Sequence, residues 1–320
     1  MTEYTVSERE EGLTLIKYAS RVLKEAPDSL IHKFLRKKNI ELNGRKADGR
    51  SILTAGDRVS FFLSDETFEK FRGRSPAEAA PAARASRVED ESLEKDRILF
   101  EDDDYLFYDK PPAMRTQSDD SGRISLNDRL LRYTGFDGKG ACRPSVCNRL
   151  DTNTSGIVLC GKSIKGLQAL NKAIKEHRIE KYYRALLSGH AENGHLTAYL
   201  SSSGNKAKVS VSDEPKPDHK EIVTGIEVIG YGSGISYAEL HLITGRKHQI
   251  RAHMAHTGHP VIGDMKYTSR GYTSPVKAER QMLHAYRVEL PEEILGGLTV
   301  SAPIPDDMRK CLKDAGITEV

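Results

Sequence analysis

Residues 69–95 interrupt the chain with a segment that is rich in Ala, Pro, Arg and Glu, EKFRGRSPAEAAPAARASRVEDESLEK. Hardly any large apolar side chain occurs in it, so the segment has little surface to bury in a hydrophobic core. Such a composition is typical of a linker. The sequence therefore predicts a small domain at 1–66, a linker at 67–95 and a larger domain at 96–320.

The composition is that of an ordinary globular protein. The chain has 320 residues, of which 38% are hydrophobic and 30% charged, which is enough for one large domain and a small one. Lys and Arg number 49 against 46 acidic residues, and the formal net charge is only +3. Any affinity for a nucleic acid must therefore come from local basic patches rather than from the whole charge.

The cysteines and the hydropathy pattern indicate a cytoplasmic protein. The four cysteines include no Cys-x-x-Cys pair, and they do not resemble the disulfide framework of a secreted chain. The segment MTEYTVSEREEG is acidic and has no apolar centre, and nowhere do about eighteen apolar residues run together. We expect a reducing compartment, no signal peptide and no membrane partner.

The N-terminal block combines a basic helix with a short hairpin. Apolar residues between Leu30 and Leu35 have helical spacing, IELNGRKA reads as a strand and an Asn-Gly turn, and GDRVSFFL reads as a closing strand. The helix carries a basic cluster of Lys33, Arg36, Lys37 and Lys38. From charge alone, a solvated surface and a contact with RNA are equally good explanations of this cluster.

The C-terminal block alternates many strand-like runs with turns. Only two helical stretches interrupt these runs, IKGLQALNKAIKEH and RKHQIRAHMAHTG. Many strands with few crossover helices predict an α+β domain with a mixed, largely antiparallel sheet. The chain has no Gly-x-Gly-x-x-Gly sequence and no phosphate-loop lysine, so no nucleotide cofactor is expected.

The stretch NRLDTNTSG, residues 148–156, precedes the apolar run IVLC. Because Asp, Asn, Ser and Gly all favour turns, a polar turn before a strand explains this stretch without any function. The alternative is that Asp151 is held in the turn for chemistry. The spacing alone does not decide between the two.

The stretch TGRKHQIRAHMAHTGHPVIGD follows the strand SYAELHLI and is expected to open a helix. Arg246 and Lys247 are expected in the first turn of this helix, where cations oppose the helix dipole and a phosphate partner would explain them. His248, His253, His256 and His259 lie in the same stretch. Their spacing is not that of a His-Glu-x-x-His zinc site, so no metal is expected.

Three segments together resemble one family, the RluA-type pseudouridine synthases. NRLDTNTSG is similar to the family's His-Arg-Leu-Asp-x-x-Thr-Ser-Gly, and KYYRAL is similar to Lys-x-Tyr-x-Ala. The long stretch that begins at Thr244 is similar to Thr-Gly-Arg-x-His-Gln-Ile-Arg-x-His followed by Gly-His-Pro-x-x-Gly-Asp. Weaker similarities are YDKPPAM and LHAYRVEL. The N-terminal block resembles the small RNA-binding module named after ribosomal protein S-four, through Ile40 to Gly44 and Gly56 to Val59.

The resemblance implies a role for several residues. Asp151 matches the catalytic aspartate, Tyr183 the tyrosine of Lys-x-Tyr, and Arg251 the arginine of His-Gln-Ile-Arg. Arg149 matches the arginine that helps to extrude the target base, and Leu283 an apolar position near the active site. The basic cluster, Arg246 and Lys247 would bind RNA.

The implied reaction converts uridine to pseudouridine. The bond from the ring nitrogen to the ribose breaks, the uracil turns, and the ring rejoins through carbon five, so no cofactor is required. Asp151 would act as nucleophile, Arg251 would stabilise its charge in a closed pocket, and Tyr183 would offer a flat face and a hydroxyl. The sequence departs from the family pattern at Asn148 and Gln117, where His is usual.

The order of domains most resembles the branch that acts on large-subunit ribosomal RNA, and a monomer is expected. The alternative from another class is a non-catalytic RNA-binding or ribosome-assembly protein that retains the fold. A metal-dependent hydrolase that uses the histidines is a third hypothesis.

Overall fold

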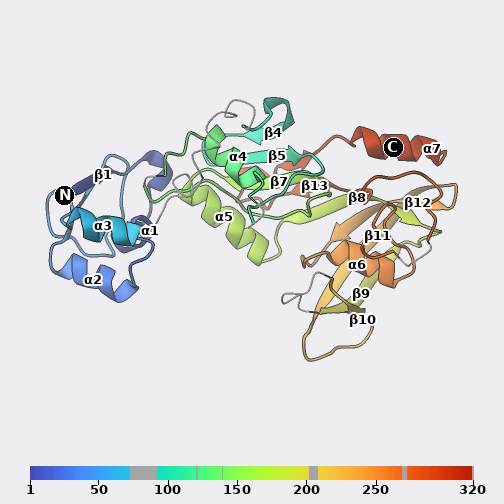
Figure 1. Ribbon diagram of the computed structural model, residues 1–320, viewed down its shortest axis with the longest axis horizontal. Helices are drawn as coiled ribbons and strands as arrows, with labels where there is room; N and C mark the ends of the chain where they lie inside the picture. Colours follow the sequence, from blue (N-terminus) through green and yellow to red (C-terminus); the bar gives the residue numbers. More distant parts are fainter. Residues whose placement is uncertain (73–91, 120–121, 139, 202–207, 269–271, 319–320) are drawn as a thin grey trace. The chain divides into compact units, whose positions relative to one another are not determined.

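The computed structural model describes residues 1–72, 92–119, 122–138, 140–201, 208–268 and 272–318 (Figure 1). None of the helices in these ranges combines the length and the apolar character that a membrane crossing requires. The chain forms two compact units, which are described separately below. Unit 1 comprises 1–107, 117–147 and 159–171, and unit 2 comprises 108–116, 148–158 and 172–320.

The N-terminal block of unit 1 contains a three-stranded antiparallel sheet with three helices. The strand order is β1-β3-β2, with β1 (Thr2–Thr5), β2 (Ile40–Leu42) and β3 (Arg58–Phe61). The helices are α1 (Leu15–Val22), α2 (Asp28–Arg36) and α3 (Asp65–Arg72). The predicted Asn-Gly turn is present, because Asn43 and Gly44 both have positive φ angles, of 52° and 70°.

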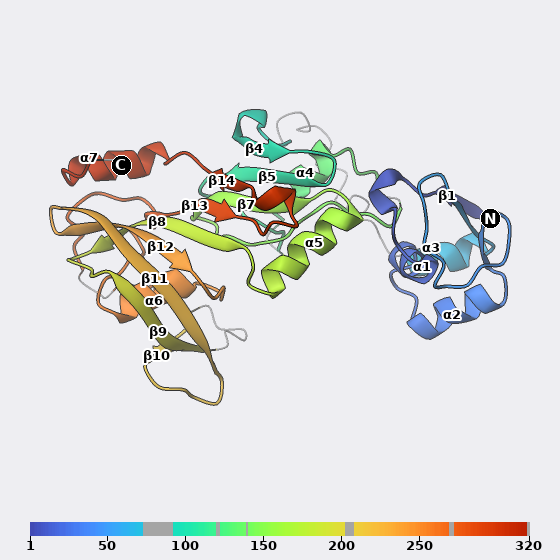
Figure 2. The same cartoon turned by 180° about the vertical axis from the view of Figure 1, so that it is seen from behind.

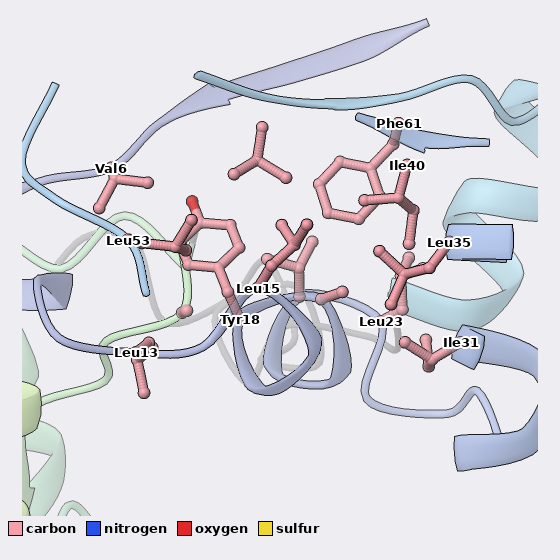
Figure 3. Packing of buried hydrophobic residues seen from close by; sticks show 14 of the residues in the cluster. Val6, Leu13, Leu15, Tyr18, Leu23, Ile31, Leu35, Ile40, Leu53 and Phe61 are labelled. Atoms are coloured by element: carbon pink, nitrogen blue, oxygen red, sulfur yellow. The ribbon is translucent and has the colours of Figure 1, made fainter. Parts of the chain in front are cut away.

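One hydrophobic cluster holds this block together (Figure 3). Leu15, Tyr18 and Leu23 point from the α1 segment toward Ile40 and Phe61 of the sheet, and all five are fully buried. Phe68 of α3 belongs to the same cluster, so the packed block extends beyond residue 66 to Arg72. The cluster also includes three residues from later in the chain, Ala141, Cys142 and Ile164.

The rest of unit 1 contains β4 (Ile98–Glu101), α4 (Leu126–Tyr133) and β6 (Ser145–Val146). Three elements are divided between the units, namely β5 (Tyr105–Lys110), β7 (Ser155–Gly161) and α5 (Ile164–Lys175). The predicted domain boundaries at 66 and 96 stay a prediction, since the compact units follow a different division. Most of the predicted linker, 73–91, lies outside the described residues.

Unit 2 is built on a long sheet with the order β10-β9-β11-β12-β8-β13, next to which lies the first half of β7. Its strands are β8 (Glu180–Ser188), β9 (Gly194–Ser201), β10 (Val211–Ser212), β11 (His219–Gly232), β12 (Ile235–Leu242), β13 (Leu283–Glu289) and β14 (Thr299–Ser301). Figure 2 shows β9, β11, β12 and β8 side by side. Within the described residues of this unit, β13 and β7 pair in parallel and the other neighbouring strands pair antiparallel, so the sheet is mixed and largely antiparallel.

Two helices complete unit 2, α6 (Gln249–His256) against β10 and β11, and α7 (Asp306–Asp314). Both helices contribute apolar side chains to the packing of the sheet, Ala252 from α6 and Met308, Cys311 and Leu312 from α7. The predicted α+β class with a mixed, largely antiparallel sheet is confirmed.

Candidate active site

The loop that carries Asp151 is fixed on both sides by hydrogen bonds. Thr116 Oγ1 donates to the carbonyl of Leu150 at 2.8 Å and accepts from its N–H at 3.1 Å. The Thr154 N–H donates to the carbonyl of Asp151 at 3.0 Å, which closes a turn. Arg280 Nη1 donates to the carbonyl of Asn153 at 3.0 Å. The segment is a turn, and the turn holds the Asp151 carboxylate in place.

The Gly of this motif is required by a close approach between strands. Gly156 has a φ of +110°, and a Cβ at this position would lie 2.2 Å from the carbonyl oxygen of Ala285 on β13. Only glycine adopts this conformation without strain. Next to it, Ser155 Oγ bonds His284 Nδ1 at 2.9 Å, which adds a side-chain contact between β7 and β13.

Arg251 connects two carboxylates. Its Nη1 donates to Oδ2 of Asp151 at 2.6 Å, and its Nε and Nη2 donate to the two oxygens of Asp264 at 2.6 and 2.9 Å. Burial alone would lower the pKa of Arg251, but the hydrogen bonds and charges of both carboxylates raise it above its usual value. Burial would raise the pKa of Asp264, but the bonds from Arg251 lower it overall. The guanidinium is thus permanently charged beside Asp151.

The start of α6 differs from the sequence-based expectation. The helix begins at Gln249, so Arg246 and Lys247 lie in the turn before it and not in its first turn. Gln249 explains this arrangement, because its side chain accepts from the backbone N–H of Arg246 and from Thr244 Oγ1 and donates to the carbonyl of Val223. These bonds bend the chain away from helical geometry before Gln249.

Tyr183 and Leu283 lie on one face of the sheet. Tyr183 pairs with Ala285 and Leu283 pairs with Ala185, so by the alternation of strands all four side chains point the same way. Both Tyr183 and Leu283 are buried. Burial raises the pKa of the Tyr183 hydroxyl, and the negative charge of Asp151 raises it further. Tyr183 is therefore a neutral phenol within the electrostatic reach of Asp151.

Lys110 is a buried lysine that supports the Asp151 loop. Its Nζ donates to the carbonyls of Pro111, Met114 and Thr152 at 2.9, 2.9 and 3.1 Å. The side chain is fully buried, and burial, followed by the charge of Arg280, lowers the pKa of Lys110 to about 7. The three carbonyls satisfy the three N–H groups of its ammonium form. Lys110 thereby ties the end of β5 to the residue after Asp151.

The predicted RNA-binding residues are exposed. Arg149, Arg246 and Lys247 lie on the surface of unit 2. In unit 1, the members of the basic cluster, Lys33, Arg36, Lys37 and Lys38, are all exposed on α2 and on the turn that follows it. Their roles in RNA binding stay predictions.

The histidines of this region have separate partners. His248 Nδ1 bonds Tyr267, His253 Nδ1 bonds Thr224 Oγ1, His256 bonds Asp213, and His259 bonds the carbonyl of Ser188. Each of these four hydrogen bonds has a partner other than Arg251. Within the described parts of the chain, no group of three or more His, Cys, Asp or Glu residues has the arrangement of a metal site.

In unit 2 the structure pairs Arg251 with Asp151 and places Tyr183 within the electrostatic reach of Asp151, while Leu283 shares the sheet face of Tyr183. The catalytic roles of these residues stay predictions. Sequence reasoning missed the supporting residues Lys110, Asp264, Gln249 and His248. All four lie within two of the motifs quoted above, YDKPPAM and the stretch that begins at Thr244, and this position in the motifs was the only sequence signal of their role.

The two departures from the family pattern are Asn148 and Gln117. The Asn148 side chain donates to the carbonyl of Ile157 at 3.4 Å, and Gln117 is exposed in unit 1.

Comparisons with known proteins identify the class. Residues 104–256 match the sequence profile of the RNA pseudouridylate synthase family. An uncharacterized RNA pseudouridine synthase of Mycoplasma genitalium is 29% identical over 91% of this chain and 89% of its own. The ribosomal large subunit pseudouridine synthase C of Vibrio vulnificus is 27% identical over 96% of this chain and 94% of its own.

Solved structures agree with this result. The human RNA pseudouridylate synthase domain containing 1 is 26% identical, with a TM-score of 0.54 over 67% of this chain and 86% of that structure. The human RNA pseudouridylate synthase domain containing 4, at 20% identity and a TM-score of 0.58, shares the fold over 69% of this chain and 94% of that structure. The chain is therefore similar to RNA pseudouridine synthases over most of its length, and residues 104–256 carry the match to the family's profile. It is accordingly an isomerase that acts on uridine in RNA.

Proposed function

We propose that the protein converts one or more uridines of large-subunit ribosomal RNA to pseudouridine, with Asp151 as nucleophile. The observation that carries the assignment of Asp151 is its ion pair with Arg251 at 2.6 Å, on a loop anchored from both sides. The ribosomal target is supported by the name of the relatives, ribosomal large subunit pseudouridine synthase C.

In the proposed reaction the Asp151 carboxylate bonds to C1′ of the ribose as the bond from N1 of uracil breaks. The uracil then turns so that C5 faces C1′, C5 displaces the carboxylate, and the proton on C5 is lost while N1 gains one. Atoms and charges balance, so we propose that neither metal nor nucleotide cofactor takes part. Tyr183 would stack on the uracil, and its phenol oxygen would relay the proton from C5.

Arg251 has a defined task in this scheme. The carboxylate loses its charge when it bonds to C1′ and regains it when C5 displaces it, and a fixed guanidinium stabilises the charged state without reorganisation. Arg149, Arg246, Lys247 and the basic cluster would hold the RNA backbone and offset the cost of extruding the base, a few kcal/mol. We propose that the protein acts as a monomer in the cytoplasm.

The decisive experiment maps pseudouridines in ribosomal and transfer RNA from cells with the protein, without it, and with Asp151→Asn in its place. We expect loss of at least one site in large-subunit ribosomal RNA without the protein and no rescue by the variant. Loss confined to transfer RNA would refute the ribosomal target. Rescue by Asp151→Asn would support the alternative of a non-catalytic assembly protein, and chelator-sensitive activity of the purified protein would refute the metal-free scheme.

A further inference from the structure

His248 lies between Asp151 and Tyr267 in unit 2. Its Nε2 is 3.6 Å from Oδ1 of Asp151, and its Nδ1 is 2.8 Å from the Tyr267 hydroxyl. The side chain is only 9% exposed, and the rings of His248 and Tyr267 meet edge to face at 5.7 Å and 83°. Its backbone is left-handed, with a φ of 56°. A non-glycine residue in this conformation costs free energy, which suggests a constraint at this position.

The hydrogen bonds of Tyr267 favour one tautomer of His248. The backbone N–H of Val209 donates to the Tyr267 hydroxyl oxygen at 3.2 Å, so the remaining hydroxyl proton is available for Nδ1 of His248. An imidazole that accepts at Nδ1 carries its own proton at Nε2. In this tautomer the N–H group of His248 faces Asp151.

The ring is neutral at physiological pH. Burial lowers the pKa of His248 to about 4, and although the charge of Asp151 raises it, Arg251, Lys266 and Lys247 lower it further. A neutral donor near the carboxylate orients it without adding a second cation next to Arg251.

Arg251 alone does not fix the carboxylate, because it binds only Oδ2. A carboxylate held through one oxygen can still rotate about its own bond to the Cβ carbon. A second donor that faces the other oxygen limits this rotation. At 3.6 Å the contact is longer than a hydrogen bond, so a small displacement of Asp151 toward His248 would form it.

We propose that His248 is a positioning residue, which the Tyr267 hydroxyl holds as the Nε2-protonated tautomer so that it orients Oδ1 of Asp151 for the reaction. This proposal rests on the proposed function, since it assigns a second donor to the same nucleophile. Once the contact with His248 closes, Asp151 has a donor on each of its two oxygens. Tyr267, whose ring also lies 5.4 Å from the guanidinium carbon of Arg251, contacts both donors.

The first test reads the tautomer directly and requires no activity. Long-range ¹H–¹⁵N correlation spectra of protein labelled with ¹⁵N-histidine report which ring nitrogen is protonated, and the His248 signals are those that disappear in His248→Gln. We expect the Nε2-protonated form in the parent at neutral pH and a mixture of tautomers in Tyr267→Phe. An Nδ1-protonated ring or an imidazolium in the parent would overturn the proposal, whichever RNA is the substrate.

The second test compares two substitutions that share the same backbone strain. Gln keeps an N–H near the position of Nε2, whereas Leu has none. With protein in excess over an RNA that the parent modifies, we expect the single-turnover rate to fall by about 10- to 100-fold in His248→Leu and only a few-fold in His248→Gln. RNA affinity should be unchanged in both. Equal losses in the two variants, or a parent-like rate in His248→Leu, would contradict the proposal.

A third comparison covers the case in which His248→Leu does not fold. Tyr267→Phe keeps the ring but removes the hydroxyl, and we expect it to slow the parent several-fold. In the His248→Gln background the same change should have little further effect, because no tautomer remains to be fixed. If the rate loss of the double variant equalled the product of the two single losses, the hydroxyl would act by a route other than His248 and the proposal would be wrong.

Discussion

At the scale of single residues, the two carboxylates that share Arg251 differ in burial. The Asp151 side chain is 26% exposed, while that of Asp264 is fully buried and also accepts from the backbone N–H groups of Lys266 and Tyr267. The same guanidinium therefore has one structural partner and one that can reach a substrate.

Asp151→Asn should separate chemistry from folding. The buried guanidinium of Arg251 keeps both bonds to Asp264, so we expect the free energy of unfolding to fall by about 1 kcal/mol or less. The nucleophile is lost, and no pseudouridine should form in a single turnover while RNA affinity at fixed salt is kept. A variant that converts uridine at the parent's rate would rule out Asp151 as nucleophile.

Asp264→Asn, unlike Asp151→Asn, should mainly reduce the stability of the fold. Here Arg251 loses its fully buried partner and is left with the partly exposed one, and we expect a loss of about 3 kcal/mol in the free energy of unfolding. Chemical denaturation measures it. If Asp264→Asn were as stable as the parent and inactive, Asp264 and not Asp151 would be the residue closest to the chemistry.

At the scale of elements, the sequence predicted the types of the elements better than their ends. The strands around Tyr183 and the helix that contains Arg251 follow from hydrophobic periodicity. The start of α6 does not, because Gln249 binds Thr244, Arg246 and Val223, and Val223 belongs to β11, far away in the sequence. The sequence could not predict the role of Asp264 either, because its pairing with Arg251 depends on how the loop after α6 folds back.

Gly156→Ala should disrupt the contact between β7 and β13. The new Cβ would meet the carbonyl oxygen of Ala285 at 2.2 Å in a backbone conformation that alanine avoids, so we expect a loss of about 3 kcal/mol or more. Gly234→Ala is the matched control, because Gly234 also has a positive φ, of 72°, but no atom lies within 4 Å of the new Cβ. Thermal unfolding should show a smaller loss there, about 1 kcal/mol. Equal losses would mean that strain alone, and not the close approach of the strands, requires the glycine.

The contact of α6 with β11 should make stability depend on pH. Burial lowers the pKa of His253, whose Nδ1 bonds Thr224 on β11, to about 4. Because the unfolded chain binds this proton near pH 6.5 and the folded chain only near pH 4, the free energy of unfolding falls as the pH drops through this window. His253→Gln should remove one proton from the uptake on unfolding between pH 4 and 6.5. An unchanged pH dependence would show that His253 is already charged in the fold.

At the scale of the whole molecule, the proposed nucleophile and the basic cluster occupy different parts of the sequence. The proposed nucleophile and its partners belong to unit 2, whereas the basic cluster belongs to the N-terminal block in unit 1. The sequence could predict this separation because charge and composition are local properties. It could not predict that the cluster of buried residues in the N-terminal block also contains Ala141, Cys142 and Ile164, since that depends on packing between distant segments.

The basic cluster should set the salt dependence of RNA binding. Lys33, Arg36, Lys37 and Lys38 are exposed, so replacing all four with Gln should leave the melting temperature unchanged. Each phosphate contact that is lost lowers the slope of log K against log salt concentration by about 0.7 to 0.9. We therefore expect a slope lower by up to about 3, with an unchanged single-turnover rate at saturating protein, because the nucleophile is untouched.

A matched pair of double variants separates local contact from overall charge. Lys37→Gln with Lys38→Gln removes two cations from the cluster, and Lys310→Gln with Lys313→Gln removes two exposed cations from α7, to which we assign no RNA contact. Both pairs change the net charge by the same amount, so a purely non-specific attraction would weaken equally in the two variants. We expect the slope to fall only in the first. An equal fall in both would mean that the basic cluster forms no RNA contact of its own and is a solvated surface.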